Sequence, residues 1–390
     1  MKILFPLALL LMSCACQHDT RAMADTPSVR FATYNGSLYS EKDGGLVARL
    51  EAGDAKAASI AAVIQHQRPD VLLINEFDYD PAHRSAHLFQ RRYLEVAQRG
   101  QAPITYPYRY LAPVNTGVPS GMDLDRNGKI AGGNDAFGFG LHPGQYGMLV
   151  LSRYPIDLDS VRTFQLFPWK DLPGAKSPVD PSSGEAWYPA DVWNRLRLSS
   201  KSHWDVPVRT PAGLVHFLVH HPTPPVFDGP EDRNGIRNRD EIRLWSEYIS
   251  DRPAPWLCDD AGACGGLTGD ALFVIAGDHN ADPVDGDSTG NPMAALLGHP
   301  RVLRFDPPAS KGAEAAAQLA GGGNITQKGN AAHDTGKFGP RVGNLRIDYV
   351  IPSQGFVVRG SGVFWPTPSE PGADWIEATD HHMVWMDLAR

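Results

Sequence analysis

The sequence predicts a layered α/β fold. Apolar segments of strand length recur along the chain, and Ala-rich or amphipathic stretches of helical character lie between several of them. Many of the apolar segments end near an acid, an amide or a histidine, as a polar site built along sheet edges requires. These polar ends run from Asn35 to His381, so an early domain boundary would divide the site. We therefore predict one domain over residues 29–390.

The expected elements follow from these patterns in chain order. Helices are predicted over Leu46–His66, which is Ala-rich, and over Asn234–Ile249, which has one charged and one apolar face. The Gly- and Ala-rich region Ala309–Gly339 is predicted to be a mobile loop, placed over the site. The expected strands are Val29–Asn35, Pro69–Glu76, Gln145–Tyr154, Gly213–His221, Leu272–Asp278, Arg346–Ser353 and Thr379–Trp385.

Composition limits the classes of function. The chain has 390 residues, 42% of them hydrophobic, which is enough for a large core. The formal net charge is -8, and no long run of Lys or Arg occurs. This balance argues against a tight, nonspecific electrostatic grip on nucleic acid, although a bound metal can neutralise substrate phosphates locally.

The N-terminus resembles an export signal, and residues 1–28 are predicted to be a leader and tether. Lys2 precedes a short apolar run that ends at Cys14, too short to span a bilayer as a helix. The segment Leu11–Cys14 resembles a lipoprotein box, in which Cys14 would be the lipidated first mature residue, although Met12 departs from the usual pattern. Ordinary cleavage after Ala24 is the alternative. Localisation is accordingly predicted as a lipoprotein of the outer membrane or cell surface, or as a periplasmic or secreted protein.

The segment Leu272–Asp278 is a continuous apolar strand that ends on Asp278 and Asn280. Side chains two apart on an extended chain point the same way, so both are expected to face one site. A carboxylate beside a carboxamide suits cation and phosphate chemistry, but Asp and Asn are also ordinary residues of turns that end strands. The companion strand ends at Asn35, Glu76 and His221 favour the site.

The ordered motifs resemble the endonuclease/exonuclease/phosphatase superfamily, which has the deoxyribonuclease I-like fold. They are Thr-Tyr-Asn35, Asn-Glu76, His221-Pro-Thr-Pro, Gly-Asp278-His-Asn280-Ala-Asp, Arg-Ile-Asp348-Tyr and Thr-Asp380-His381. The resemblance covers roughly the whole mature chain and implies a four-layer α/β/β/α sandwich. Three departures are His279, a doubled His at both His motifs, and insertions near residues 107–145 and 165–192.

Glu76 is the first candidate for a metal ligand. A charged residue at the end of a buried apolar strand is costly unless it is paired or bound to metal, or unless it emerges into solvent. Asn35 and Asp380 are its expected partners, and oxygen ligands of this kind suit Mg²⁺ or Mn²⁺.

His381 is the candidate general base, since histidine titrates near neutral pH. The resemblance implies that Asp348 orients its ring and that His221 contacts the phosphate or protonates the leaving oxygen. Strand alternation turns His220 and His382 away, so we predict structural roles for them. Asp278 would position or activate the nucleophilic water or protonate the leaving group, and Asn280 would hold a phosphoryl oxygen.

Two further signals lie outside these motifs. Asp123, Asp125 and Asn127, followed by Gly128, match the first half of an EF-hand-like loop and predict a structural Ca²⁺ site, with a plain polar turn as the alternative. Cys258 and Cys264 would form a small disulfide in an oxidising compartment.

The segment Arg195–Trp204 allows two interpretations, a polar strand that contacts phosphate or an exposed amphipathic strand.

As a whole, the sequence predicts an exported, divalent-metal-dependent hydrolase of a phosphodiester or phosphomonoester. Within this class, a secreted nuclease acting on DNA or RNA is the alternative. A noncatalytic, surface-anchored binding module is the alternative from another class. None of these three functions implies a protein partner.

Overall fold

The computed structural model describes residues 27–390 and contains two β-sheets packed face to face. Residues 1–26 of the predicted leader, with the expected cleavage points at Cys14 and Ala24, lie outside the described residues. The first sheet has the order β12-β13-β1-β2-β4-β3, with strands β1 (Val29–Leu38), β2 (Val71–Phe77), β3 (Tyr108–Tyr110), β4 (Met148–Ser152), β12 (Val357–Val363) and β13 (Val384–Ala389). The second has the order β11-β8-β7-β6-β5, with strands β5 (Arg162–Thr163), β6 (His203–Thr210), β7 (Gly213–His220), β8 (Leu272–Asp278) and β11 (Asp348–Pro352).

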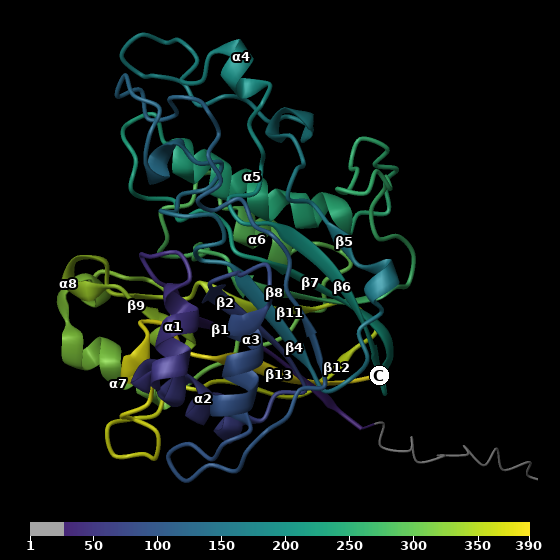
Figure 1. Cartoon of the computed structure of the whole chain (residues 1–390), viewed down its shortest axis with the longest axis vertical. Helices are drawn as coiled ribbons and strands as arrows, with labels where there is room; N and C mark the ends of the chain where they lie inside the picture. Colours follow the sequence, from purple (N-terminus) through teal and green to yellow (C-terminus); the bar gives the residue numbers. More distant parts are fainter. Residues whose placement is uncertain (1–26) are drawn as a thin grey trace, which may run out of the picture.

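Helices cover the outer face of each sheet, and this arrangement gives four layers (Figure 1). Helices α1 (Gly45–Ala52), α2 (Ala55–Gln67) and α3 (Arg84–Phe89) pack on the first sheet, whereas α5 (Arg233–Tyr248) and α6 (Pro292–Leu297) pack on the second. The remaining elements are α4 (Ala190–Trp193), α7 (Lys311–Ala320), α8 (Gly339–Val342) and the small hairpin of β9 (Gly336–Lys337) and β10 (Asn344–Leu345). The predicted four-layer α/β/β/α sandwich is confirmed.

Strand β7 shows how the pattern of apolar residues produces the layers. Phe217 and Val219 point toward the first sheet, where the Phe217 ring lies 5.7 Å from that of Phe31. Leu218 points the other way, into the cluster that includes Trp245 of α5. Both faces of the strand are therefore buried, as a nearly continuous apolar sequence requires.

Strand pairing brings the polar strand ends together. Strands β1 and β2 are parallel and pair Asn35 with Asn75, so their carboxyl ends lie at the same edge. In the second sheet, β8 pairs with β11 in a register that sets Asp278 opposite Asp348. The packing of the two sheets then places both edges around one site.

Two local predictions are wrong. The expected helix Leu46–His66 is divided into α1 and α2, because Gly53 takes a left-handed conformation and the Asp54 side chain caps α2 by accepting a hydrogen bond from Ala57 N. The region Ala309–Gly339, expected to be a mobile loop, contains helix α7, which Ser310 caps in the same way.

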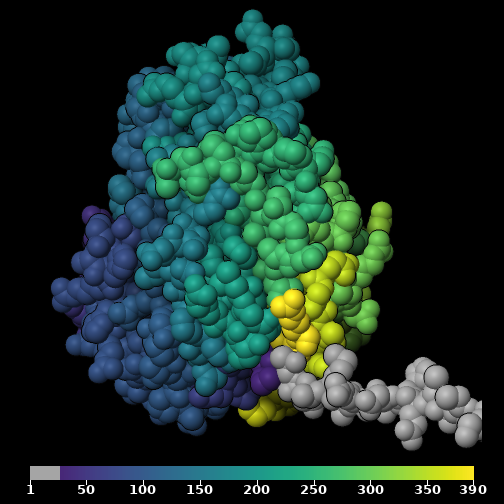
Figure 2. Space-filling view, turned by 90° about the vertical axis from the view of Figure 1, so that its right-hand side faces the viewer, coloured from purple at the N-terminus to yellow at the C-terminus, as the bar shows by residue number. Residues whose placement is uncertain are grey.

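The two insertions, near residues 107–145 and 165–192, lie beyond α5 on the side away from the first sheet, at the top of Figures 1 and 2. Trp169 of the second insertion donates a hydrogen bond of 2.8 Å to Asp240 of α5, and Trp187 donates one of 3.2 Å to the carbonyl of Leu124 in the first insertion. Both insertions are thereby attached to α5 and to each other. A disulfide joins Cys258 and Cys264. No helix among residues 27–390 is long and apolar enough to cross a membrane.

Candidate active site

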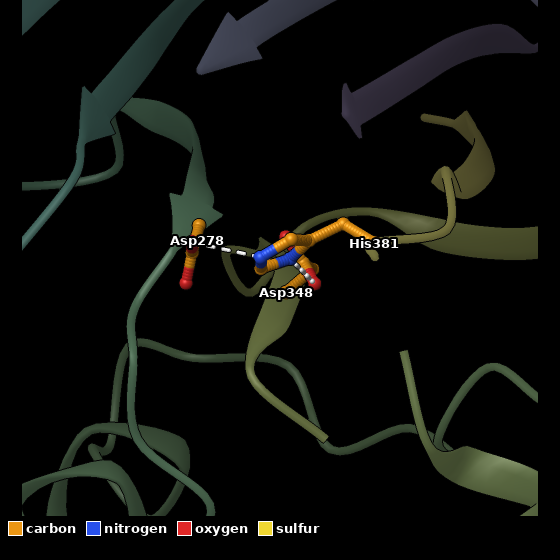
Figure 3. Close-up of side chains that lie close together, drawn as sticks. All are labelled: Asp278, Asp348 and His381. Atoms are coloured by element: carbon orange, nitrogen blue, oxygen red, sulfur yellow. Dashed lines mark hydrogen bonds and ion pairs between the residues drawn. The ribbon is translucent and has the colours of Figure 1, made fainter. Parts of the chain in front are cut away.

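His381 lies between two buried carboxylates at the centre of the site (Figure 3). Its Nδ1 is 2.9 Å from Oδ2 of Asp348, and its Nε2 is 3.6 Å from Oδ2 of Asp278. Asp348 stands at the start of β11 and Asp278 at the end of β8, so the sheet fixes both carboxylates. The Asp348 contact orients the imidazole and aims its Nε2 toward Asp278.

The carboxylate of Asp278 contacts two further side chains besides His381, one in β1 and one directly after β7. Its Oδ2 accepts a hydrogen bond of 3.1 Å from the amide of Asn35 at the carboxyl-terminal part of β1. The same oxygen lies 3.3 Å from Nε2 of His221, the residue after β7. Three of the residues singled out in the sequence, Asn35, His221 and His381, therefore gather on one buried carboxylate.

The charges of this group shift its pKa values in opposite directions. Burial alone would lower the pKa of His381, but Asp348 and Asp278 outweigh burial and raise it well above the usual value. Burial would raise the pKa of Asp278, whereas the charges of His381 and His221 lower it. His381 thus holds its proton between two carboxylates, and any positive charge that joins the site lowers its pKa toward neutrality.

Glu76 adds a further carboxylate beside this group. Its backbone has a φ of 58°, a left-handed conformation that costs a non-glycine residue roughly 1–3 kcal/mol. Among residues 27–390, no side chain or backbone group donates a hydrogen bond to this carboxylate. Its charge nevertheless acts on His221 and on Tyr39, which also feels the charge of Asp380.

A divalent cation fits Glu76 and its neighbours. Glu76 and Asp380 offer carboxylate oxygens, the latter from a side chain that is 58% exposed, and Asn35 offers its amide oxygen. The charges of Glu76 and Asp380 both act on Tyr39, and oxygen donors of this kind suit a divalent cation. Asp278, Asp348 and His381 also offer atoms within 4.8 Å of one another, but hydrogen bonds already engage them. Glu76 is thus a residue that could hold a divalent cation.

The remaining predicted residue, Asn280, adopts a left-handed conformation with a φ of 50° just after β8. Its backbone N–H donates to Oδ1 of Asp278 over 2.9 Å, and its side-chain amide donates to the carbonyl of Pro222 over 3.1 Å. One amide hydrogen is thus used within the protein, and the other is available to a ligand.

The histidines predicted to be structural lie away from Asp278. His220 is fully buried, with Nδ1 3.1 Å from Nε2 of His203. The ring of His382 stacks on that of Trp365 at 3.5 Å, and its Nδ1 lies 3.1 Å from the carbonyl of Thr335. Both rings face the interior rather than the site.

Two site residues have no signal in the sequence motifs. Thr335 precedes β9 and donates a hydrogen bond of 2.8 Å to the Asp348 oxygen that also contacts His381. Lys201 lies in the segment before β6, and the charges of Glu241, Glu76 and Asp278 act on it. Both residues come from segments remote in sequence from the motifs, so only tertiary packing reveals them.

The predicted Ca²⁺ loop forms a compact acidic turn in the first insertion. Carboxylate oxygens of Asp123, Asp125 and Asp135 lie within 4.8 Å of one another. Asp123 accepts hydrogen bonds from the backbone of Asn127 and Gly128 over 3.1 and 2.9 Å. Asp135, the residue after the twelfth position of the loop, takes the place that a terminal acid would have.

Comparison with known proteins decides the family. The model of the Endonuclease/Exonuclease/phosphatase family matches residues 43–381, nearly the whole described chain. The chain belongs to this family. Its members are hydrolases that act on phosphoester bonds, so the chain is a hydrolase of ester bonds. No curated protein matches the sequence.

Three solved structures are similar to this chain. An endonuclease/exonuclease/phosphatase from Beutenbergia cavernae is similar at 19% identity with a TM-score of 0.51, covering 93% of this chain and 72% of its own. Sphingomyelinase C from Streptomyces griseocarneus matches at 16% identity and a TM-score of 0.46, covering 93% of this chain and 100% of its own. The mannosyl-6-phosphatase Bt3783 from Bacteroides thetaiotaomicron matches at 13% identity and a TM-score of 0.44, covering 93% of this chain and 100% of its own.

Proposed function

We propose that this family member hydrolyses a small phosphoester by attack of water, with a divalent cation held at Glu76. The observation that carries the proposal is the convergence of His381, His221 and Asn35 on Asp278 beside that unpaired glutamate. Proton carriers and acidic ligands in one buried place are the parts that hydrolytic phosphoester chemistry needs.

Each residue has a role that follows from its contacts. His381 takes the proton of the attacking water, and Asp348 holds its ring in the tautomer that presents Nε2. His221 and the free amide hydrogen of Asn280 donate to the oxygens of the phosphoryl group. Mg²⁺ or Mn²⁺ at Glu76, Asn35 and Asp380 would neutralise phosphoryl charge.

Charge and shape favour a small substrate over a long duplex. The net charge of -8 repels a polyanion, and the two insertions add protein mass beside α5. A nuclease is the competing member of the same reaction class, and the experiment below separates the two.

Purified protein should be incubated with small phosphomonoesters, small phosphodiesters, plasmid, single-stranded DNA and RNA, each with Mg²⁺ and with excess chelator. We expect chelator-sensitive release of phosphate or alcohol from a small ester. Rapid nicking of plasmid at moderate salt would make the enzyme a nuclease. Equal turnover with and without chelator would remove the metal from the proposal. Saturable ligand binding without any turnover would favour a noncatalytic module.

We also propose that the acidic turn of Asp123, Asp125 and Asp135 holds a structural Ca²⁺. The supporting observation is that three carboxylates converge in a loop whose backbone N–H groups already orient two of them. Ca²⁺ should raise the melting temperature of the wild type and leave that of an Asp123→Asn, Asp125→Asn double variant unchanged. An equal rise in both proteins would leave the turn without a calcium role.

Export remains a proposal that rests on the leader sequence. If Cys14 is lipidated, Cys14→Ser should release the protein from the membrane fraction or block its maturation. A mature protein that begins at Asp25 and stays soluble would instead identify Ala24 as the cleavage point.

A further inference from the structure

Lys201 is a buried lysine whose ammonium makes no close ion pair, although the charge of Glu241 acts on it. The residue is 6% exposed, and among residues 27–390 no carboxylate lies within 4.0 Å of its ammonium and no acceptor binds it. Burying a charged amine without a partner costs several kcal/mol, by the general energetics of ion transfer. The burial of Lys201 is therefore best explained by a bound ligand that provides an acceptor for its ammonium.

Arg237 provides the contrast, since it is a second cation in the same neighbourhood. Its guanidinium donates to the carbonyls of Leu198, Phe137 and Arg197 at 2.8, 2.6 and 3.1 Å. Arg237 is thereby satisfied by the protein and serves as a structural brace. Lys201 has no such set of acceptors, so a bracing role does not explain it.

The backbone around Lys201 is fixed against the His221 loop. Glu241 of α5 is buried and accepts hydrogen bonds from the backbone N–H groups of Ser200 and Thr223, at 2.5 and 2.6 Å. The Ser200 hydroxyl donates to the carbonyl of His221 over 3.5 Å. One carboxylate therefore clamps the segment that carries Lys201 to the loop that carries His221.

The first insertion adds a second anchor. The backbone N–H of Asn115 donates to the carbonyl of Lys201 over 2.9 Å, and the Asn115 side chain donates to the carbonyl of Ser199 over 2.8 Å. The position of Lys201 thus depends on a segment that belongs to the insertion. The charge of Lys201 acts on His221, and the charges of Glu241, Glu76 and Asp278 act on Lys201, so the lysine lies near the residues of the proposed site.

We propose that the Lys201 ammonium binds a nonbridging oxygen of the phosphoryl group, next to His221. This inference rests on the proposed function and adds a specificity-determining cation to it. An oxyanion supplies both the charge and the acceptors that the buried ammonium lacks.

The test compares Lys201→Met, which keeps the length of the side chain and removes its charge, with wild type. The probe is inorganic phosphate in chelator, read as the rise in melting temperature. We expect phosphate to raise the melting temperature of the wild type but not that of Lys201→Met. Without phosphate, Lys201→Met should melt at the same or a higher temperature, because an unpaired buried charge is gone.

Activity gives the second readout. For a small phosphoester with Mg²⁺, Lys201→Met should lose about ten- to hundredfold in kcat/KM, the effect of one charge-assisted hydrogen bond. Lys201→Arg should recover part of this loss. Lys176→Met, which removes an exposed lysine of the second insertion, is the matched control and should behave as wild type.

A phosphate-induced rise that survives in Lys201→Met would overturn the proposal. A lowered melting temperature with unchanged KM and kcat would also overturn it, because Lys201 would then be structural. If the wild type hydrolyses none of the phosphoesters, the proposed function fails, while the phosphate arm still decides whether Lys201 binds an oxyanion. Should Lys201→Met fail to fold, Lys201→Gln is read by the same two measurements.

Discussion

The two histidine pairs occupy equivalent places and differ in what each ring touches. His220 ends strand β7 and His221 follows it, whereas His381 and His382 precede β13. In each pair one ring contacts Asp278, whereas its neighbour points into the interior. Two adjacent histidines therefore serve opposite purposes at both places.

Burial does not separate the two members of a pair. His220 is 0% exposed and His221 3%, while His381 and His382 are 5% and 4% exposed. The carboxylate contact separates them. Burial lowers the pKa of His382 to about 3, but the carboxylates around its neighbour raise the pKa of His381 well above the usual value. The two carboxylates around His381 make it the proton carrier, whereas burial and the charge of Lys201 lower the pKa of His221 despite its contact with Asp278.

Removing the shared acid should have the largest effect. Asp278→Asn takes away the group on which His221, His381 and Asn35 converge, so kcat/KM should fall about a thousandfold, within the range of general acid–base contributions. Steady-state kinetics with Mg²⁺ measure this loss, with circular dichroism to show that the fold is kept. A loss of less than tenfold would mean that Asp278 only shapes the site.

Asp348→Asn should cost less, about a hundredfold, and should also move the pH profile. Loss of this carboxylate destabilises the imidazolium of His381 and lowers its pKa. If neutral His381 is the base, activity rises as the pH passes its pKa, so this limb should shift to lower pH in the variant. A limb that stays in place or shifts to higher pH would assign the titration to another group.

His221→Asn tests the other pair and should cost about ten- to hundredfold in kcat/KM, since it removes one donor to the phosphoryl group. His220→Phe is the matched variant, because His220 packs among the rings of His203, His279 and Trp245. It should keep turnover per folded molecule. A larger activity loss in His220→Phe than in His221→Asn would reverse the assignment for this pair.

The interior histidines should affect the pH dependence of the free energy of unfolding rather than the turnover. Burial lowers the pKa of His203 and His279 to about 4, that of His382 to about 3, and that of His220 well below its ordinary value of 6.5. The unfolded chain therefore binds more protons below pH 6.5, and the free energy of unfolding falls as the pH falls from 6.5 toward 4.

Each such histidine adds about 1.4 kcal/mol per pH unit to that slope. Denaturant unfolding between pH 7 and pH 4.5 should show a slope that is shallower by about this amount in His382→Phe than in the wild type. Equal slopes would show that His382 is protonated in the folded protein.

The polar ends of β1, β7 and β8 were predictable because alternation along a strand follows directly from sequence. The strand expected over Thr379–Trp385 is wrong, since β13 begins at Val384 and His381 lies in the segment before it. Asn35, His221, Asp278, Asp348 and His381 lie together as the pattern and the family resemblance implied. His279, a departure from the family pattern, is also explained by packing. Its ring lies 4.4 Å from that of His220 and 5.0 Å from that of Tyr349, so it fills a place suited to an aromatic side chain.

The contacts made by irregular segments were not predictable. Thr335 contacts Asp348 from the region Ala309–Gly339, which the sequence predicted to be a loop. That region is rich in Gly and Ala, so the helix α7 that Ser310 caps was not predicted. Lys201 lies in a segment that the sequence allowed to be exposed, and the structure buries it through Glu241 of a distant helix. Such clamps depend on tertiary contacts that no local pattern encodes.

The most direct test of the account compares two neighbouring substitutions, His381→Ala and His382→Phe, in kcat/KM for one small phosphoester at saturating Mg²⁺. We expect His381→Ala to lose about a thousandfold and His382→Phe, which keeps the stack on Trp365, to stay within about threefold of wild type. Similar losses in the two variants, or a larger loss in His382→Phe, would contradict the claim that the acid contact, rather than burial, makes the catalytic histidine.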